Sequence, residues 1–355
     1  MKRLGKYAAA SVALILLLVL VSCSSGEEGK SVTIGVYGGD WEANIGEAID
    51  SFEKETGIKV NVIARTDAEW YMKMRAADGS NVPYDLLILQ PDTIQRAMSA
   101  DLLEPIDEEK APHVAELYNS VQQRFEKDGK DYAAAFSMGQ LGIAYAPDAV
   151  ENVPENWLDL ADEEYQAQLG LSSPSYSAGL QFFSGVTQAL GGEEGNPEDI
   201  DKTFEELKKI NKNAVAYPDN PGTIQTLLDR GEISIIPFWD GRIFALQDAG
   251  MDIDFVYPKD GAVAAVASWA MMKNAPHEDN AYKLLDYLSS PEVHSMFSEK
   301  SYYGMANENT QYSDAIKDKV KVGEDQFASL KWVDYEVSTG KVSEWTNRWS
   351  RELGE

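Results

Sequence analysis

Strands and helices alternate along the first ninety residues, and this alternation constrains the fold more than any other feature. Apolar runs predict strands, and between them lie segments whose apolar residues recur at helical spacing. Because nearly continuous apolar strands joined through helices form parallel sheets covered on both faces, we expect an α/β fold. The predicted elements are strands at Val32–Tyr37, Ile58–Ile63 and Tyr84–Leu89, with helices at Trp41–Thr56 and Glu69–Ala77.

The same pattern returns in the second half of the chain. Strands are predicted at Ile233–Phe238 and Ile253–Tyr257, and helices near 179–190, 198–211, 221–230 and 242–249. A further helix is expected over 279–299, and a last one over Val342–Leu353. The chain of 355 residues is long enough for two domains, and each half supplies its own α/β unit.

The charge balance excludes one class of partner. The chain has 31 basic and 59 acidic residues, which gives a net charge of −28. A surface this acidic repels phosphate backbones, so we expect no binding of nucleic acid.

Cysteine and histidine are scarce, which limits the chemistry. One cysteine cannot form a disulfide within the chain, and three histidines cannot complete a Cys/His zinc cluster. We expect no cofactor and no bound metal. The chain also lacks the G-x-S-x-G elbow of serine hydrolases, and the histidines His113, His277 and His294 are expected to be solvated. A secreted hydrolase is therefore the weaker alternative to a binding protein.

The N-terminus has the features of a bacterial lipoprotein leader. A basic start precedes an apolar run from Ala8 to Val21, and Leu20-Val21-Ser22-Cys23 resembles a lipobox. The prediction is a signal peptide over 1–23, lipidation of Cys23 and a flexible tether over 24–30. Removal of Lys2, Arg3 and Lys6 with the leader takes the net charge from −28 to −31. An uncleaved membrane anchor is the alternative. The protein is expected to be exported, either lipid-anchored to the outer face of the cytoplasmic membrane or in the periplasm.

Aromatic and acidic residues follow three of the predicted strands. Ligands of open α/β sheets bind beyond the carboxyl ends of strands, so these positions are candidate ligand contacts. Aromatic faces and carboxylates together suit an ammonium group, through cation–π attraction and charge-assisted hydrogen bonds. The alternative is that the tryptophans are packing residues and the acids are helix caps. The residues are Tyr37, Asp40 and Trp41, then Gln90 and Asp92, then Trp239 and Asp240.

A serine-rich turn precedes the helix predicted near 179–190. Tyr176 and Ser177 lie in this turn, and hydroxyls with free N–H groups at a helix N-terminus form an anion site. An ordinary serine cap is the alternative. If both sets of residues face one cleft, the ligand is a zwitterion or an amine with a polar tail.

The chain resembles bacterial extracellular solute-binding proteins of the spermidine/putrescine-binding family. The likeness is clearest at 51–60, 84–88, 141–150, 189–210, 239–261 and 281–309, and the Trp-x-Gly-x₃-Ala-x₃-Ala-Gly pattern from Trp239 to Gly250 is the most specific. The resemblance implies a type II periplasmic-binding fold with two lobes that close on a solute. It also implies a monomer that delivers the solute to the membrane subunits of an ABC importer, and a loop tyrosine at Tyr303 near the ligand.

The lobe boundaries follow from this resemblance. The chain should cross between lobes near Met138–Leu141 and Lys259–Val266. Lobe I would comprise 31–138 plus 263–330, and lobe II 139–262. The segment 331–355 would pack near the hinge or on lobe II.

The ligand expected from the family is in question here. Where family members carry acids for a polyamine, this chain has Ala265–Ser268 and, near the helix start, Ala178 and Gln181. A shorter amine or an amino-acid-like zwitterion, similar to γ-aminobutyrate, fits better. Thiamine, a phosphonate or ferric iron at Tyr302-Tyr303 remain alternatives.

Two further residues have open roles at this stage. Arg242 either receives a ligand carboxylate or pairs with a nearby acid. Trp269 either faces the ligand or belongs to the core.

Overall fold

The computed structural model describes residues 30–77 and 82–354. The predicted leader with Cys23 lies outside these residues, as does nearly all of the tether. Within the described part, no helix is long and apolar enough to cross a membrane. Histidine, cysteine and carboxylate side chains in that part form no cluster suited to a metal ion.

The first parallel sheet is built as predicted. β1 (Ser31–Val36) pairs in parallel with β2 (Lys59–Ala64) on one side and with β3 (Leu86–Leu89) on the other. The helices α2 (Asp40–Thr56) and α3 (Asp67–Ala77) connect these strands. α2 ends where expected, because Gly57 adopts the left-handed conformation (φ 70°) that glycine tolerates best.

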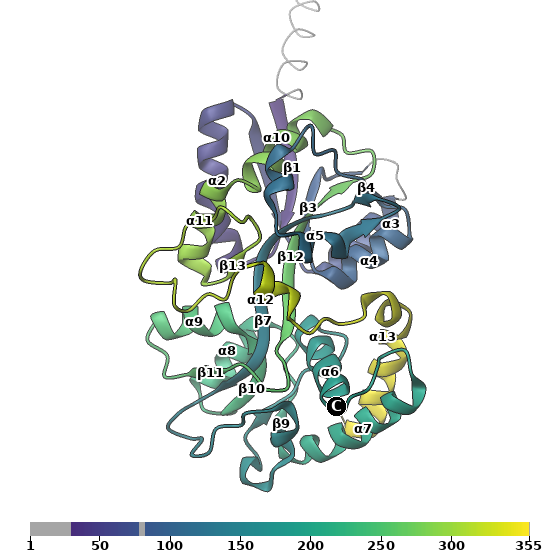
Figure 1. Ribbon diagram of the computed structural model, residues 1–355, viewed down its shortest axis with the longest axis vertical. Coiled ribbons are helices and arrows are strands. Elements are labelled where there is room, and N and C mark those ends of the chain that lie inside the picture. Colours follow the sequence, from purple (N-terminus) through teal and green to yellow (C-terminus); the bar gives the residue numbers. More distant parts are fainter. Residues whose placement is uncertain (1–29, 78–81, 355) are drawn as a thin grey trace, which may run out of the picture.

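A second set of parallel strands forms the lower part of the molecule in Figure 1. β8 (Leu169–Gly170) pairs in parallel with both β9 (Ala214–Ala216) and β10 (Ile235–Trp239). The predicted helices near these strands are all present. They are α6 (Ser177–Ala189), α7 (Pro197–Ile210), α8 (Pro221–Asp229) and α9 (Asp240–Asp248).

Two long strands join the two sets, and their full extent was not predicted. β7 (Ala134–Tyr145) and β12 (Val263–Met272) pair antiparallel from Val263 opposite Leu141 to Trp269 opposite Ala134. β12 pairs with β3 at one end, while the far end of β7 pairs with β10. Figure 1 shows both strands running from the upper to the lower part of the molecule. Nearly every residue of both strands is buried, including the polar Ser137 and Gln140 of β7 and Ser268 of β12.

The buried side chains form separate cores on either side of these crossing strands. One core contains β1–β3, α2 and the first part of β7, and we call this part lobe I. Two adjoining clusters contain α6–α9, β8, β10 and the second part of β7, and we call this part lobe II. The α/β two-lobed fold is thus confirmed, with parallel strands inside each lobe and antiparallel strands between them.

Shorter elements complete the described chain. Lobe I includes the helix α4 (Pro91–Ser99), which follows β3 directly. The others are β4 (Leu103–Glu104), α5 (Asn119–Gln122), β5 (Glu126–Lys127), β6 (Lys130–Asp131), β11 (Asp254–Val256), α10 (Glu278–Leu288), α11 (Pro291–Ser301), β13 (Gly304–Met305) and α12 (Glu324–Ala328).

The C-terminal helix α13 (Tyr335–Trp349) is longer than predicted and contacts both lobes. Trp345 and Trp349 are buried in the core of lobe II, where the Trp345 ring stacks on Phe183 with 4.9 Å between centroids. The Arg348 guanidinium lies 4.1 Å from the centre of the Phe204 ring. α13 also packs against α4 of lobe I, so it spans the space between the lobes.

The prediction of one helix over 279–299 was wrong. α10 ends at Leu288, and Ser290 caps α11 by accepting a hydrogen bond from the Val293 amide. Pro291 starts the new helix because a proline fits its first turn and cannot continue the old one.

The expectation of solvated histidines was also wrong. His294 is fully buried and accepts a hydrogen bond from the Asn307 amide at 3.0 Å. Burial lowers its pKa to about 3, so the ring is neutral. His113 and His277 are half-buried and lie beside Asp286 and Asp85.

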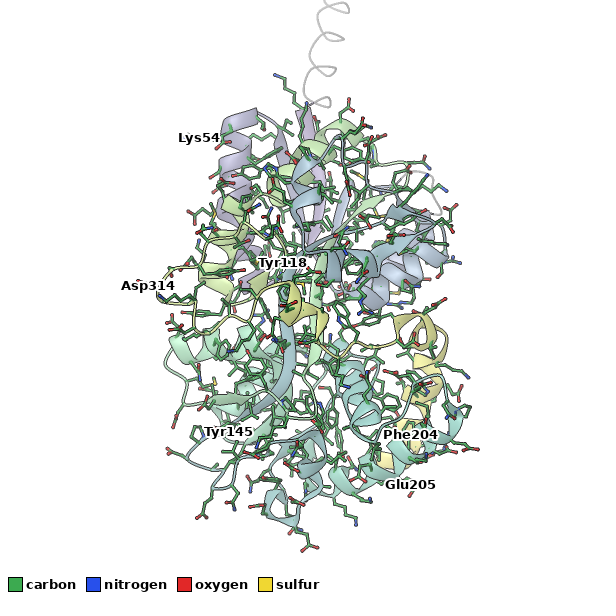
Figure 2. The ribbon with its side chains drawn as sticks, in the orientation of Figure 1. Lys54, Tyr118, Tyr145, Phe204, Glu205 and Asp314 are labelled. Atoms are coloured by element: carbon green, nitrogen blue, oxygen red, sulfur yellow. The ribbon has the colours of Figure 1, made fainter. Side chains whose placement is uncertain are left out.

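Charged side chains cover the outside of both lobes. In Figure 2, Lys54 marks the far end of lobe I, and Glu205 lies on α7 at the opposite end of the molecule. Phe204, next to Glu205 in sequence, is fully buried. This arrangement separates the acidic surface from the apolar cores.

We predict that Asp85→Ala destabilises lobe I by about 2–4 kcal/mol. The Asp85 carboxylate is fully buried and accepts hydrogen bonds from the amides of Thr33 and His277, both at 2.7 Å. Its loss leaves two partly buried donors unpaired. Urea unfolding measures the effect, with exposed Asp50→Ala on α2 as the control. Unfolding free energies within about 0.5 kcal/mol of each other for the two variants would contradict the prediction.

Candidate functional site

Three predicted residues of lobe I lie together at the ends of β1 and β3. Tyr37 follows β1, while Gln90 and Asp92 follow β3. The Gln90 Oε1 atom is buried and has no hydrogen-bond partner among the described residues, whereas the Tyr37 hydroxyl interacts with the Asp67 carboxyl. Such atoms are costly to leave unpaired unless a ligand or water completes them.

Asp67 joins this group, although the sequence analysis did not select it. It begins α3, just beyond the end of β2, and its Oδ1 atom accepts a hydrogen bond from the Gln90 amide at 2.9 Å. Applying the strand-end rule to β2 as well would have found it. Burial and the negative charge of Asp92 raise the pKa of Asp67 to about 7.

Asp92 has a cation beside it, whereas Asp67 has none. The Arg96 guanidinium lies 3.2 Å from Asp92 Oδ2. Within residues 30–77 and 82–354, no lysine, arginine or histidine forms an ion pair with Asp67. Lobe I therefore presents two neighbouring carboxyls with one compensating charge. Burial raises the pKa of Tyr37 well above its usual value, and the charge of Asp67 adds to this effect.

Lobe II contributes an aromatic pair. The rings of Tyr176 and Trp239 meet edge to face with 5.7 Å between centroids. Trp239 donates a hydrogen bond from Nε1 to Gln181 Oε1 at 2.7 Å. The buried Tyr176 hydroxyl has no partner in the described chain. Burial raises the pKa of Tyr176, and Tyr303 and, more weakly, Asp67 of lobe I add to this effect.

Tyr303 packs against two glycines that no larger residue could replace without movement. A Cβ atom built at Gly139 would lie 2.6 Å from the Tyr303 ring, and one at Gly241 would lie 2.5 Å from it. Gly139 is on β7, and Gly241 lies in the first turn of α9. Tyr303 comes from the segment after α11, so its ring lies where the two lobes meet.

Asp240 is committed to the protein rather than to a ligand. Its Oδ1 atom accepts hydrogen bonds from the amides of Gln140 at 3.0 Å and Gly241 at 2.7 Å. Tyr257 donates a hydrogen bond to Oδ2 at 3.1 Å. Burial raises the pKa of Asp240 to about 6. These bonds support the alternative in which Asp240 has a structural role, since the carboxylate holds β7 to the start of α9.

Trp41 also proves to be a core residue. It is 6% exposed and contacts the rings of Tyr37, Phe136, Trp269 and Phe297. Trp41 lies on the buried face of α2, so an aromatic residue just after β1 does not by itself indicate a ligand contact. Trp269 is likewise fully buried, which supports its core interpretation.

Asp40 pairs with Arg242 across the two lobes. Asp40 begins α2 of lobe I and Arg242 lies in the first turn of α9 of lobe II. Arg242 donates a hydrogen bond to Asp40 Oδ2 at 3.1 Å. The alternative in which Arg242 pairs with a nearby acid is therefore confirmed. Because the Asp40 side chain is largely exposed, we expect this ion pair to contribute little on its own.

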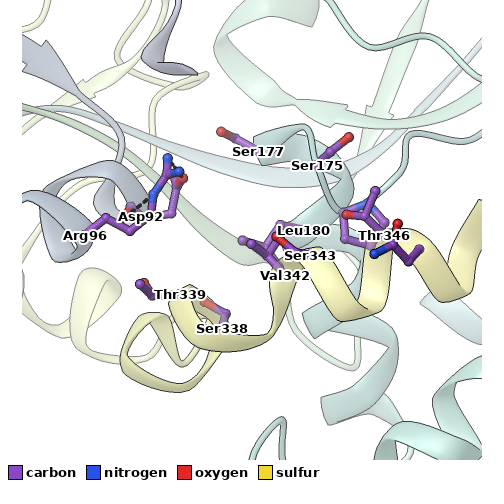
Figure 3. Close-up of a pocket in the computed structure, with 12 residues that line it drawn as sticks. Asp92, Arg96, Ser175, Ser177, Leu180, Ser338, Thr339, Val342, Ser343 and Thr346 are labelled. Carbon is purple, nitrogen blue, oxygen red and sulfur yellow. Dashed lines mark hydrogen bonds and ion pairs between the residues drawn. The ribbon is translucent and has the colours of Figure 1, made fainter. Parts of the chain in front are cut away.

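A cavity of about 440 Å³ adjoins this site, and Asp92 lines both (Figure 3). Arg96 and Asp92 of α4 form one wall and the turn before α6 forms another, including Ser175 and Ser177. The third wall is α13. The two sets of residues expected to face one cleft, Asp92 from a strand end and Ser177 from the serine-rich turn, thus line the same space.

Tyr302 and Tyr303 do not form a joint site. Lys319 lies over the Tyr302 ring at 4.7 Å, whereas Tyr303 packs on the glycines between the lobes. The two adjacent side chains thus contact different parts of the molecule.

The comparison with known families decides what kind of protein this is. The family model described as bacterial extracellular solute-binding protein matches residues 47–324. The chain belongs to this family. Members of the family bind solutes for ABC transporters and are not enzymes, which leaves the hydrolase alternative without support. The match ends before α13.

Individual relatives align with most of the length of this solute-binding protein. The spermidine/putrescine-binding periplasmic protein of Escherichia coli (strain K12) is 28% identical over 295 residues, which are 78% of this chain and 81% of that one. The gamma-aminobutyric acid-binding protein of Pseudomonas aeruginosa is 23% identical over 314 residues, which are 87% and 86% of the two chains.

A solved structure shows the same fold. The spermidine/putrescine ABC transporter substrate-binding protein of Streptococcus pneumoniae superposes with a TM-score of 0.73 at 19% identity. The superposition covers 91% of this chain and 99% of that one. The two-lobed arrangement is therefore shared even where the sequences have diverged.

We predict that the stabilising effect of Asp67→Asn grows as pH rises from 4 to 8. The folded protein holds the Asp67 proton up to about pH 7, whereas the unfolded chain releases it near pH 4. Ionisation therefore lowers the stability of the wild type as pH rises through this range, and the amide variant escapes this loss. Thermal unfolding at several pH values measures the difference in Tm. Exposed Asp50→Asn is the control, and a Tm difference for Asp67→Asn that stays constant with pH would contradict the prediction.

Proposed function

We propose that this solute-binding protein captures a small amine or amino-acid-like zwitterion between its lobes and delivers it to the membrane subunits of an ABC importer. The observation that carries the proposal is the Asp67 carboxyl beside Asp92, with no cation paired to Asp67 in the described chain. A ligand ammonium supplies the missing charge.

The surroundings of Asp67 suit an ammonium group. The buried hydroxyl of Tyr176 has no partner in the described chain, and the ring of Trp239 lies beside Tyr176. Aromatic faces attract a desolvated cation, and carboxylates accept its hydrogen bonds. Of the ten residues predicted to bind the ligand, this proposal keeps Tyr37, Gln90, Asp92, Tyr176, Ser177, Trp239 and Tyr303, and it adds Asp67.

The opposite end of the ligand is proposed to be a carboxylate near the start of α6. Ser177 begins this helix, and its N-cap Tyr176 provides no side-chain hydrogen bond to the first turn. The N–H groups there suit an anion, and Arg96 on the facing wall adds a positive charge. A zwitterion would place its ammonium at Asp67 and its carboxylate at Ser177.

The relatives support an amine, and the departures of this chain favour a short one. One relative is named for spermidine and putrescine, and another for γ-aminobutyric acid. This chain has Ala178 and Gln181 on α6, and Gln181 Oε1 accepts a hydrogen bond from Trp239. The acids that would hold the far amine of a polyamine are therefore missing from this side.

Capture is proposed to involve a hinge in the crossing strands. The bending points would lie near Met138–Leu141 and Lys259–Val266, where β7 and β12 pass between the lobe cores. The Asp40–Arg242 ion pair would form as the lobes approach. We further propose that lipid on Cys23 holds the protein at the outer face of the cytoplasmic membrane, close to its importer.

We predict that amine binding weakens as pH falls below about 7 and releases protons. The ammonium binds the ionised Asp67, so a protonated carboxyl must first lose its proton. Calorimetry with γ-aminobutyrate, δ-aminovalerate and putrescine in buffers of different ionisation enthalpy measures both effects. Asp67→Asn should weaken binding about tenfold to hundredfold through loss of a charged hydrogen bond.

Two controls make this test decisive. Asp50→Asn removes an exposed carboxylate on α2 and should leave affinity unchanged. Asp240→Asn removes a buried carboxylate bonded to β7 and α9, and it should affect stability more than ligand affinity. Tight binding of amines by Asp67→Asn with no proton release would contradict the proposed site.

A further inference from the structure

The cavity beside the amine site has one wall that the proposed function leaves without a role. This wall is one face of α13, and the residues along it recur at spacings of three and four. Five of the six are polar. They are Ser338, Thr339, Val342, Ser343, Thr346 and Asn347.

The adjoining stripe of α13, on which Ser338, Trp345 and Trp349 are buried, explains why these residues are held in place. Trp345 and Trp349 are buried in the core of lobe II, which fixes the rotation of the helix about its axis. The polar face is therefore directed toward α4 of lobe I by the packing of its apolar face. Figure 3 shows Ser338 and Thr339 at the first turns of α13 and Thr346 farther along, with Asp92 and Arg96 across the cavity.

Two hydroxyls on this wall are buried without partners. Ser338 is 0% exposed, and its Oγ atom makes no hydrogen bond to any described residue. The Oγ1 atom of Thr346 is also buried and unpaired in the described chain. Helix-interior serine and threonine usually bond to a carbonyl one turn earlier, as Thr339 does with Tyr335. Ser338 and Thr346 do not, so their hydrogen-bonding capacity remains for an occupant of the cavity.

The volume of the cavity indicates the size of that occupant. At roughly 30 Å³ per water molecule, 440 Å³ corresponds to about 15 waters. A plain short amino acid would fill only part of this space. The hydroxyl-rich wall and the volume of the cavity together suit a ligand with several polar, uncharged groups.

We infer that the α13 face is a subsite for a hydroxylated part of the ligand, so that the preferred solute is a polyhydroxylated amino acid or amino-sugar acid. This inference rests on the proposed function, because it assumes that the ammonium of the same ligand lies at Asp67 and Asp92. Ser338 and Thr346 would exchange hydrogen bonds with the ligand hydroxyls. A solute without those hydroxyls would leave Ser338 and Thr346 without hydrogen-bond partners, and it would therefore bind more weakly.

The test compares a hydroxylated zwitterion with a plain one. The probes are 2-amino-2-deoxygluconate and γ-aminobutyrate, and calorimetry gives the affinity for each. The wild type should bind the hydroxylated probe at least tenfold more tightly. Ser338→Ala and Thr346→Val should each reduce that preference severalfold while leaving the affinity for γ-aminobutyrate unchanged.

The matched control is Thr226→Val on α8. Thr226 is an exposed helical threonine whose hydroxyl donates to the Gly222 carbonyl, and it is not among the residues that line the cavity. This variant should preserve the preference. Thermal unfolding of each variant shows that the fold is retained, and Thr346→Ser serves as a milder change that keeps the hydroxyl and should keep the preference.

The outcomes separate this inference from the proposed function. Equal affinity for the two probes, or a preference that survives both substitutions, overturns the hydroxyl subsite while amine binding still stands. Failure of both probes and of putrescine to bind overturns the proposed function as well. If only the hydroxyl subsite is overturned, water molecules form hydrogen bonds with the Ser338 and Thr346 hydroxyls.

Discussion

The antiparallel pairing of β7 with β12 is the interaction on which the rest of this structure depends. Each strand contributes to both lobe cores, so the pairing fixes the two sheets relative to each other. It also brings the ends of β1, β2 and β3 opposite the start of α6 and the end of β10. The proposed ligand site between the lobes depends on this placement, since its residues come from segments that are far apart in the sequence.

The electrostatics of the site depend on a carboxyl group that forms no ion pair in the described chain. Most carboxylates of this acidic chain are exposed or bonded within the protein, as Asp85 and Asp240 are. Asp67 differs because it is held beside Asp92 and forms no ion pair with a cation in the described part of the chain. The buried hydroxyl of Tyr176 likewise has no hydrogen-bond partner in the described chain. Groups that lack ion-pair or hydrogen-bond partners within the protein favour ligand binding, because the ligand can supply those partners.

Local patterns predicted most of the fold. The strands and helices around β1–β3 and α6–α9 were found from apolar periodicity, because each element buries one face or both. The long strands β7 and β12 were found only as short crossings, since their pairing joins residues more than a hundred positions apart. The break between α10 and α11 was missed although Pro291 marks it.

The site was only partly predictable for a related reason. Position at a strand end indicates that a residue can reach the cleft, but side-chain direction depends on packing. Trp41 points into a cluster of aromatic rings and Asp240 bonds to backbone amides, whereas Tyr37 and Asp92 lie at the site. Asp67 follows the same rule after β2. The role of α13 could not be read from sequence, because the two tryptophans that orient it bury in a core formed by other segments.

A crystal structure of the protein with the tightest-binding amine of the series tests the central claim most directly. The account predicts the ligand between the lobes, with its ammonium nitrogen about 3 Å from an Asp67 carboxylate oxygen and beside the Trp239 ring. An ammonium bound elsewhere, with Asp67 still unpaired, would contradict the account.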